Sequence, residues 1–357
     1  MLGVREKKTT LADIAKLAGV SKTAVSKALL GSRGKTIKVS EETALRIKKV
    51  AEELNYFPNH AARQLATKRS GFIAYILSDS IKDGLNNSYF NRYLSGVERG
   101  CRENGYGLYV ARANLMDIKN VVFPEKLKQQ SVDGIIAVGQ IPDEVFSEFR
   151  RYSVPVIFLN RDFDYERRFP TFCADAMDGL RKAVEYGISL NHRKFWFCRC
   201  MEKADKIIKK IIPVKTHFEK SIDGFKMKFT DFLEGFPYDE EVIGKRLLEE
   251  WKKTPDAEKP TFIFGDTRII IAFLHKLADA GIKCPEDISA MSSADLEINS
   301  YFYPPVSSMD YDFEQMGFDA VKIMLDAIGK EINLPVEKSR NDYTARLIER
   351  KSTRRLK

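Results

Sequence analysis

Five side chains between positions 21 and 27 are suited to contacting a polyanion. Ser21, Lys22, Thr23, Ser26 and Lys27 carry hydroxyls and amines, which hydrogen-bond to phosphate oxygens and base edges. The first 70 residues hold fifteen Lys and Arg against six Asp and Glu, a surplus of nine that equals the net charge of the whole chain. This composition is typical of a segment that meets nucleic acid. On charge alone, the alternative is a solvated basic face.

The surrounding sequence predicts three short helices that would hold these side chains. Thr10, with Asp13 three residues later, resembles a capping box at the start of the first helix, and Gly19 ends that helix. Ser21 caps a second helix over 22–30, and Ser40 caps a third over 41–54. A glycine turn between two short helices predicts a helix-turn-helix whose second helix enters the major groove. The alternative is a three-helix bundle whose polar face meets only water.

Beyond residue 71 the pattern alternates apolar strands with helices. The run Phe72–Leu77 is continuously apolar, which is typical of a strand buried on both faces. Two successive strand-and-helix sets predict an α/β fold of doubly wound parallel sheets in two lobes. We therefore predict a helix-turn-helix domain over 1–58, a hinge helix and linker over 59–70, and a two-lobed domain over 71–357.

Composition argues against several other classes of protein. No apolar run is long enough to span a membrane, the N-terminus lacks an apolar signal core, and the five cysteines are scattered, so we expect a cytoplasmic protein. Cys198 and Cys200 with His192 would make a poor tetrahedral metal site, because no second pair of thiols is present. No nucleophile elbow or phosphate-binding loop is found. We therefore expect no metal, no cofactor and no enzymatic activity.

The motifs of the first 65 residues resemble the LacI/GalR (lac repressor) family of transcriptional regulators. The resemblance is carried by Thr10–Lys27, Val39–Thr43 and Leu54–Leu65. It implies that Lys22 and Thr23 form the main base-reading pair, with Lys27 close by. It also implies that six residues touch the DNA backbone: Thr10, Ser21, Ser26, Asn55, Tyr56 and Asn59.

The resemblance also identifies a hinge helix that folds when two subunits sit on an operator. In this segment Leu65 would wedge into the minor groove, with Ala62 and Arg63 at the DNA beside it. Ordinary helix packing is the alternative role for Leu65. The basic loop 31–38 is longer than the loop of well-known family members, and it either adds phosphate contacts or is simply solvated.

The remainder resembles the periplasmic-binding-protein-like core of the same family, which binds small molecules between its lobes. Asn160, Arg161, Asp266 and Asp295 lie where members contact a ligand, although Asp266 could instead cap a helix. The family's arginine stands three residues before a glycine-aromatic pair. Matching that pair to Gly224–Phe225 places Ser221 at the arginine position. Because the cleft chemistry departs from the family pattern, either the ligand is unusual or no small molecule is sensed.

These features lead to a functional prediction. We expect a repressor that binds a near-palindromic operator in double-stranded DNA as a homodimer, with dimer contacts from the lobe beginning at Phe72. A sugar or sugar-derived effector would change the lobe arrangement and hence the operator affinity. The alternative is a cytoplasmic ligand-binding receptor of the sugar-binding class, without operator specificity.

Overall fold

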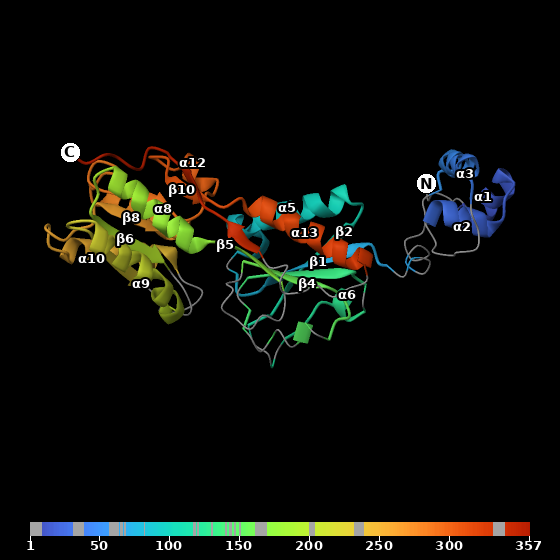
Figure 1. Ribbon diagram of the computed structural model, residues 1–357, viewed down its shortest axis with the longest axis horizontal. Helices are drawn as coiled ribbons and strands as arrows, with labels where there is room; N and C mark the ends of the chain where they lie inside the picture. The colour runs from blue at the N-terminus through green and yellow to red at the C-terminus, as the bar shows by residue number, and fades with distance from the viewer. Residues whose placement is uncertain are drawn as a thin grey trace, which may run out of the picture.

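The computed structural model shows a small helical head followed by two α/β lobes, with the first lobe lying between the head and the second lobe (Figure 1). It describes residues 9–30, 39–56, 64, 67, 69–81, 83–116, 119, 121–129, 131–139, 141–142, 145, 148–149, 151–160, 170–199, 204–231, 239–330 and 340–357. Within these residues, no helix is long and apolar enough to cross a lipid bilayer.

The head consists of helices α1 (Leu11–Ala18), α2 (Lys22–Leu30) and α3 (Glu41–Glu53). Each helix contributes one fully buried branched residue to a common core, namely Ile14, Val25 and Ile47. The predicted helix boundaries agree with the structure to within one residue. Apolar residues at helical spacing define these elements, because each helix must bury one stripe against the other two.

The first lobe has a six-stranded parallel sheet in the order β11-β5-β4-β3-β1-β2. Its elements are β1 (Phe72–Ser78), η1 (Gly84–Asn86), α5 (Ser88–Glu103), β2 (Gly107–Ala113), α6 (Glu125–Lys128), β3 (Gly134–Val138), β4 (Val156–Leu159), β5 (Thr171–Ala174), α13 (Phe313–Lys330) and β11 (Arg340–Tyr343). Strands β3 and β4 are buried along their whole length, as expected for a sheet covered on both faces.

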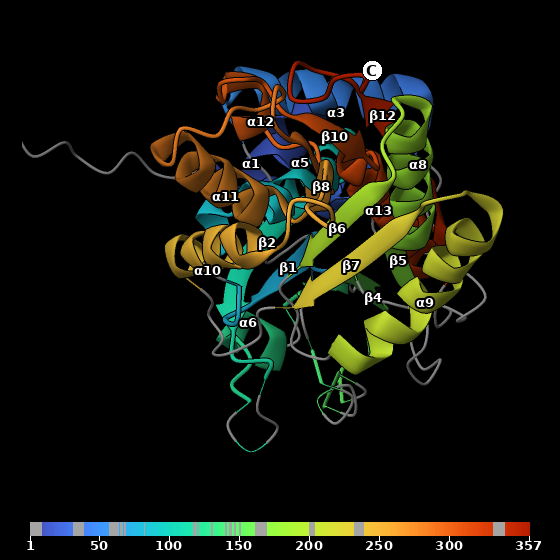
Figure 2. The same cartoon turned by 90° about the vertical axis from the view of Figure 1, so that its left-hand side faces the viewer.

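The second lobe, which faces the viewer in Figure 2, has a six-stranded sheet in the order β12-β10-β9-β8-β6-β7. Strand β12 is antiparallel to β10. Its elements are α8 (Ala176–Ser189), β6 (Lys194–Arg199), α9 (Ala204–Ser221), β7 (Lys226–Asp231), α10 (Glu240–Lys253), β8 (Phe262–Gly265), α11 (Thr267–Asp279), β9 (Ser289–Ser292), α12 (Ile298–Tyr301), β10 (Ser307–Asp310) and β12 (Arg346–Ile348).

The two lobes are interleaved along the chain, which the prediction of two successive sets did not anticipate. The chain passes between lobes three times: from β5 to α8, from β10 to α13, and from β11 to β12. Helix α13 returns to the first lobe and packs along α5, where a Cβ at Gly96 would lie 1.8 Å from the carbonyl oxygen of Glu314. The three connections therefore form a hinge at the β5 and β10 side of the two sheets.

Candidate nucleic-acid interface and effector site

The turn between α1 and α2 is fixed by local hydrogen bonds. The Thr10 backbone N–H donates to Asp13 Oδ2 at 2.8 Å, and the Asp13 N–H donates to Thr10 Oγ1 at 3.4 Å, which completes the predicted capping box. Gly19 ends α1 with φ +64°, in the left-handed region that favours glycine. The Ala24 N–H donates to Ser21 Oγ at 3.2 Å at the start of α2. These bonds set the angle at which α2 leaves α1.

Helix α2 has an apolar side and a polar side. Val25 is fully buried in the head core, whereas Lys22 and Thr23 at the start of the helix are exposed. Ser26 and Lys27, one turn further on, are half-buried. These polar residues share a face, because positions three and four apart lie together on a helix. The two side chains expected to read bases are thus the more exposed pair.

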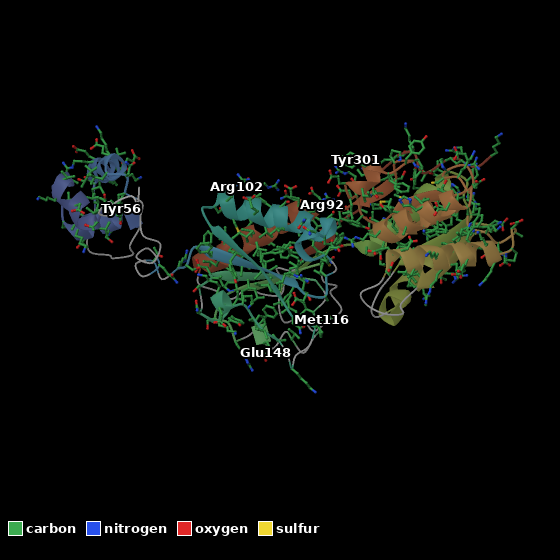
Figure 3. All side chains as sticks on the ribbon, turned by 180° about the vertical axis from the view of Figure 1, so that it is seen from behind. Tyr56, Arg92, Arg102, Met116, Glu148 and Tyr301 are labelled. Carbon is green, nitrogen blue, oxygen red and sulfur yellow. The ribbon has the colours of Figure 1, made fainter. Side chains whose placement is uncertain are left out.

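Two further candidates follow α3. Asn55 is exposed and has φ +47°, which Asn tolerates better than most residues. Tyr56 is half-buried against the head core (Figure 3). The remaining candidates of this region lie outside the described residues, namely Asn59, Ala62, Arg63 and Leu65. The basic segment 31–38 and the candidate effector residue Arg161 also lie outside them.

Asn160 directly follows the carboxyl end of β4, where a ligand would approach a parallel sheet. Its φ is +59°, and its Oδ1 accepts hydrogen bonds from the hydroxyls of Tyr89 at 2.9 Å and Tyr93 at 3.4 Å. The ring centroid of Phe313 lies 4.7 Å from that of Tyr89. Asn160 therefore lies beside an aromatic cluster from α5 and α13, which sequence reasoning did not assign to the site.

Asp266 and Asp295 both follow strands of the second lobe but have different surroundings. Asp266 occupies the N-cap position of α11 without a capping hydrogen bond from its side chain, and its Oδ1 accepts from Ser293 Oγ at 3.5 Å. Asp295 Oδ1 accepts from Arg350 at 2.7 Å and from Ser308 at 2.6 Å. Burial raises the pKa of Asp295, but these hydrogen bonds outweigh burial and the net pKa is lowered. Asp295 is therefore held by the protein itself.

Ser221 does not join these residues. It is the last residue of α9, it is exposed, and its hydroxyl donates to the His217 carbonyl at 2.7 Å. The following Gly224 has φ +70° and leads into the amino end of β7. Ser221 therefore lies at the edge of the sheet opposite to Asp266, and the match of Gly224–Phe225 to the family's glycine-aromatic pair is not supported.

Sequence reasoning also missed an ion cluster at the hinge. Asp310, the last residue of β10, is 7% exposed and lies 2.7 Å from Arg92 of α5 and 2.8 Å from Arg346 of β12. Arg92 also donates to the Asp295 carbonyl at 3.0 Å. Figure 3 shows Arg92 at the end of α5 that is nearest to the second lobe. Arg92 is more than 200 residues from both Asp295 and Asp310 in the chain, so residue spacing gave no signal of this cluster.

His192, considered as a metal ligand, holds the C-terminal segment instead. Its ring nitrogens lie 2.9 Å from Thr261 Oγ1 and 2.9 Å from the Arg354 carbonyl oxygen. Burial lowers the pKa of His192 to about 4. Cys198 is buried within β6, and Cys200 lies outside the described residues.

Both the head and the two-lobed part of the chain match known protein families. Residues 10–59 match the model of bacterial regulatory proteins of the lacI family, and residues 184–353 match a periplasmic binding protein-like domain. The chain therefore combines a LacI-family helix-turn-helix domain with a periplasmic binding protein-like domain. It is 29% identical to the probable HTH-type transcriptional repressor ExuR of Bacillus subtilis (strain 168), over 90% of this chain and 92% of that protein. It is 27% identical to the HTH-type transcriptional repressor PurR of Vibrio vulnificus (strain CMCP6), over 89% and 92%.

Solved structures show the same fold. The lac repressor dimer bound to operator and the anti-inducer ONPF has a TM-score of 0.69 at 21% identity, covering 98% of this chain and 100% of that one. A complex of the transcriptional regulator CelR with cellobiose has a TM-score of 0.64 at 22% identity, covering 97% and 100%. The family match of the head and the repressors among its relatives identify this chain as a DNA-binding transcriptional regulator.

Proposed function

We propose that the chain is a cytoplasmic repressor that binds a near-palindromic operator as a homodimer and responds to a small molecule between its lobes. The observation that carries this proposal is the exposed polar face of α2, held at a fixed angle by the Gly19 turn. Lys22 and Thr23 would contact base edges in the major groove, and Thr10, Ser21, Ser26, Lys27, Asn55 and Tyr56 would support them at the DNA. Asn59 would contact the DNA backbone, and Ala62, Arg63 and Leu65 would act at the minor groove.

The direct test is selection of bound fragments from the source genome by the purified full-length chain. We expect the selected fragments to be enriched in a shared two-fold symmetric motif, because a homodimer contacts two half-sites. Fragments bound no better than bulk competitor DNA, with and without metabolite extract, would instead favour a ligand-binding receptor without operator specificity.

An exposed aromatic surface supports the dimer. Tyr301 and Tyr303 at α12 are 76% and 90% exposed, and Ile298 on the same helix is 45% exposed. His275 of α11 contacts Phe302 edge-on at 5.1 Å, so this surface continues from α12 to α11. Large aromatic residues are enriched at interfaces and carry much of their binding energy. We propose that this surface contributes to the dimer, in addition to the first lobe.

Analytical ultracentrifugation tests this role. Replacing Tyr301 and Tyr303 by serine is expected to raise the dimer dissociation constant about ten-fold or more, since an aromatic hot spot contributes about 2 kcal/mol. Ile212, an apolar residue of α9 in the second lobe that is 51% exposed, provides the control, and Ile212→Ser should leave dimerisation unchanged. A wild-type chain that is monomeric at micromolar concentration would contradict the homodimer.

We propose that the effector binds near Asn160, Arg161, Asp266 and Asp295. Ser221 is not part of this proposed site, because it lies at the opposite edge of the sheet. Tyr89, which is half-buried beside Asn160 and packs on the buried rings of Tyr93 and Phe313, supports a ligand with a flat or ring-shaped apolar face, such as a sugar. Calorimetric titration with sugars, nucleosides and sugar phosphates tests this. Binding that is lost in Asn160→Ala supports the site, and no binding by any of them would favour a regulator that senses no small molecule.

A further inference from the structure

An ion pair joins the two lobes at a distance from the hinge. Arg268 Nη1 in the second lobe lies 2.6 Å from Asp83 Oδ2 in the first lobe, and 3.2 Å from Glu240 Oε1 in its own lobe. Asp83 belongs to the turn between β1 and α5, whereas Arg268 and Glu240 lie in the first turns of α11 and α10. A single guanidinium group therefore bridges the turn of one lobe and a helix of the other.

The Asp83 turn is attached firmly to the first lobe. Arg112 of β2 donates to the Asp79 carbonyl at 3.2 Å and forms an ion pair with the Asp79 carboxylate at 3.2 Å. The backbone of Gly84 lies against the Arg112 guanidinium, where a Cβ would come within 2.9 Å of Nη1. Asp83 itself has φ +65°, an unfavourable conformation that persists only where the surroundings impose it. These contacts tie the Asp83 turn to β2, so Asp83 moves together with the sheet of the first lobe.

Arg268 occupies a position that is unfavourable for a cation. It lies in the first turn of α11, where the positive end of the helix dipole repels positive charge, and that turn contains no acidic residue. Asp83 and Glu240 supply the compensating negative charge across loops and lobes. Glu240 offsets this charge from within the second lobe, and Asp83 is the partner that reaches Arg268 from the first lobe.

The sheet orders show that this bridge is sensitive to lobe rotation. The connections leave from β5 and β10, whereas Asp83 follows β1, three strands from β5, and Arg268 follows β8, two strands from β10. At about 4.8 Å per strand, the bridge lies roughly 10–14 Å from the hinge, so a rotation of about 10° moves its two ends about 2 Å apart. The Arg92–Asp310 pair adjoins a connection directly and would survive such a rotation.

We propose that Arg268 is a latch that holds the two lobes in the arrangement described here, and that this bridge contributes to the lobe equilibrium on which an effector would act. The regulatory part of this proposal rests on the proposed function, in which the lobe arrangement controls operator binding. The side chains of Arg268 and Asp83 are 32% and 40% exposed, so solvent screens the pair. Its loss is expected to shift the lobe equilibrium about two- to five-fold, the range measured for partly exposed ion pairs.

The chain offers a matched control for this latch. Lys276 lies two turns after Arg268 on α11 and pairs with Glu241 of α10 at 2.5 Å, so it joins the same two helices without reaching the first lobe. Lys276, Arg268 and Asp83 line one hollow of about 650 Å³. Arg268→Met and Lys276→Met therefore remove the same charge from the same hollow, but only Arg268→Met removes a contact between lobes.

The test measures the distance between the lobes in the full-length chain without DNA. Spin labels are introduced as non-canonical amino acids at the exposed positions Lys126 and Glu249, and labelled protein is diluted with unlabelled protein so that only distances within one chain are detected. Arg268→Met and Asp83→Asn should each add or enlarge a second distance population by about two- to five-fold, and Lys276→Met should not. The charge-neutral Asp83→Asn keeps the test valid if Arg268→Met fails to fold.

Two results would overturn the latch. One is an unchanged distance distribution in both Arg268→Met and Asp83→Asn. The other is a shift in Lys276→Met as large as that in Arg268→Met, which would indicate general loosening of the second lobe. Because no DNA is present, these results are independent of whether the chain binds an operator, and the failure of the latch is thereby separated from the failure of the proposed function.

Discussion

Gly19 sets the angle between α1 and α2, and replacing it by alanine should loosen the head without changing its core. Its φ is +64°, and a Cβ built on this glycine meets no atom within 4 Å. Gly19→Ala therefore causes no clash, and its cost is the left-handed backbone alone, about 1–2 kcal/mol. The equilibrium population of molecules with an open head should therefore rise about 5- to 30-fold.

Hydrogen exchange followed by mass spectrometry on the full-length chain measures this effect. Amides of α1 and α2 should exchange about 5- to 30-fold faster in Gly19→Ala, and Gly19→Asn should recover part of the protection because Asn tolerates this conformation. Gly105 is a matched control, because it has φ +69° and equally open space but lies in the first lobe. The reasoning is refuted if head exchange is unchanged in Gly19→Ala, or if Gly105→Ala accelerates it equally.

Three further perturbations test other parts of the structure. Burial lowers the pKa of His192 from 6.5 to about 4, so the unfolded chain binds this proton at a higher pH than the folded chain does. The free energy of unfolding should therefore fall as pH drops from 6.5 towards 4, by at most about 2 kcal/mol between pH 7 and 5. Urea titrations should show a flatter pH dependence in His192→Gln. Asp310→Asn should lower the free energy of unfolding by about 1–3 kcal/mol, because it leaves Arg92 and Arg346 without their shared carboxylate. Asp326→Asn, which breaks an exposed pair with Lys330, should change the free energy of unfolding little. Equal effects of the two substitutions would contradict a stabilising role of Asp310 at the hinge. Leu65→Ala should weaken operator binding about ten-fold, and unchanged affinity would exclude the wedge.

Local sequence signals predicted the head well. The capping box at Thr10, the left-handed Gly19 and the cap at Ser21 are interactions within three to five residues, and the structure contains each of them. Apolar spacing likewise located most of the strands, because a strand buried on both faces is a continuous apolar run. Such features depend on neighbours in the chain and are therefore visible in one sequence.

Long-range features were not predictable in this way. The return of α13 to the first lobe, the Arg92–Asp310 pair and the Arg268–Asp83 bridge all join segments far apart in sequence, and no local pattern encodes their partners. The position of Ser221 was likewise not predictable, since the Gly224–Phe225 pattern does not show at which edge of the sheet it lies. Sequence therefore predicted the exposed polar face of α2 better than it predicted the surroundings of the candidate effector residues.

The central claim is that the exposed face of α2 reads the operator, and affinity for a selected operator measured with Lys22→Ala tests it most directly. Lys252→Ala on α10 removes the same charge from an exposed site in the second lobe. We predict that Lys22→Ala lowers the affinity for the operator by about 1–3 kcal/mol per half-site, while binding to unrelated DNA changes much less and Lys252→Ala changes neither. Equal operator affinity for wild type and Lys22→Ala would contradict the account.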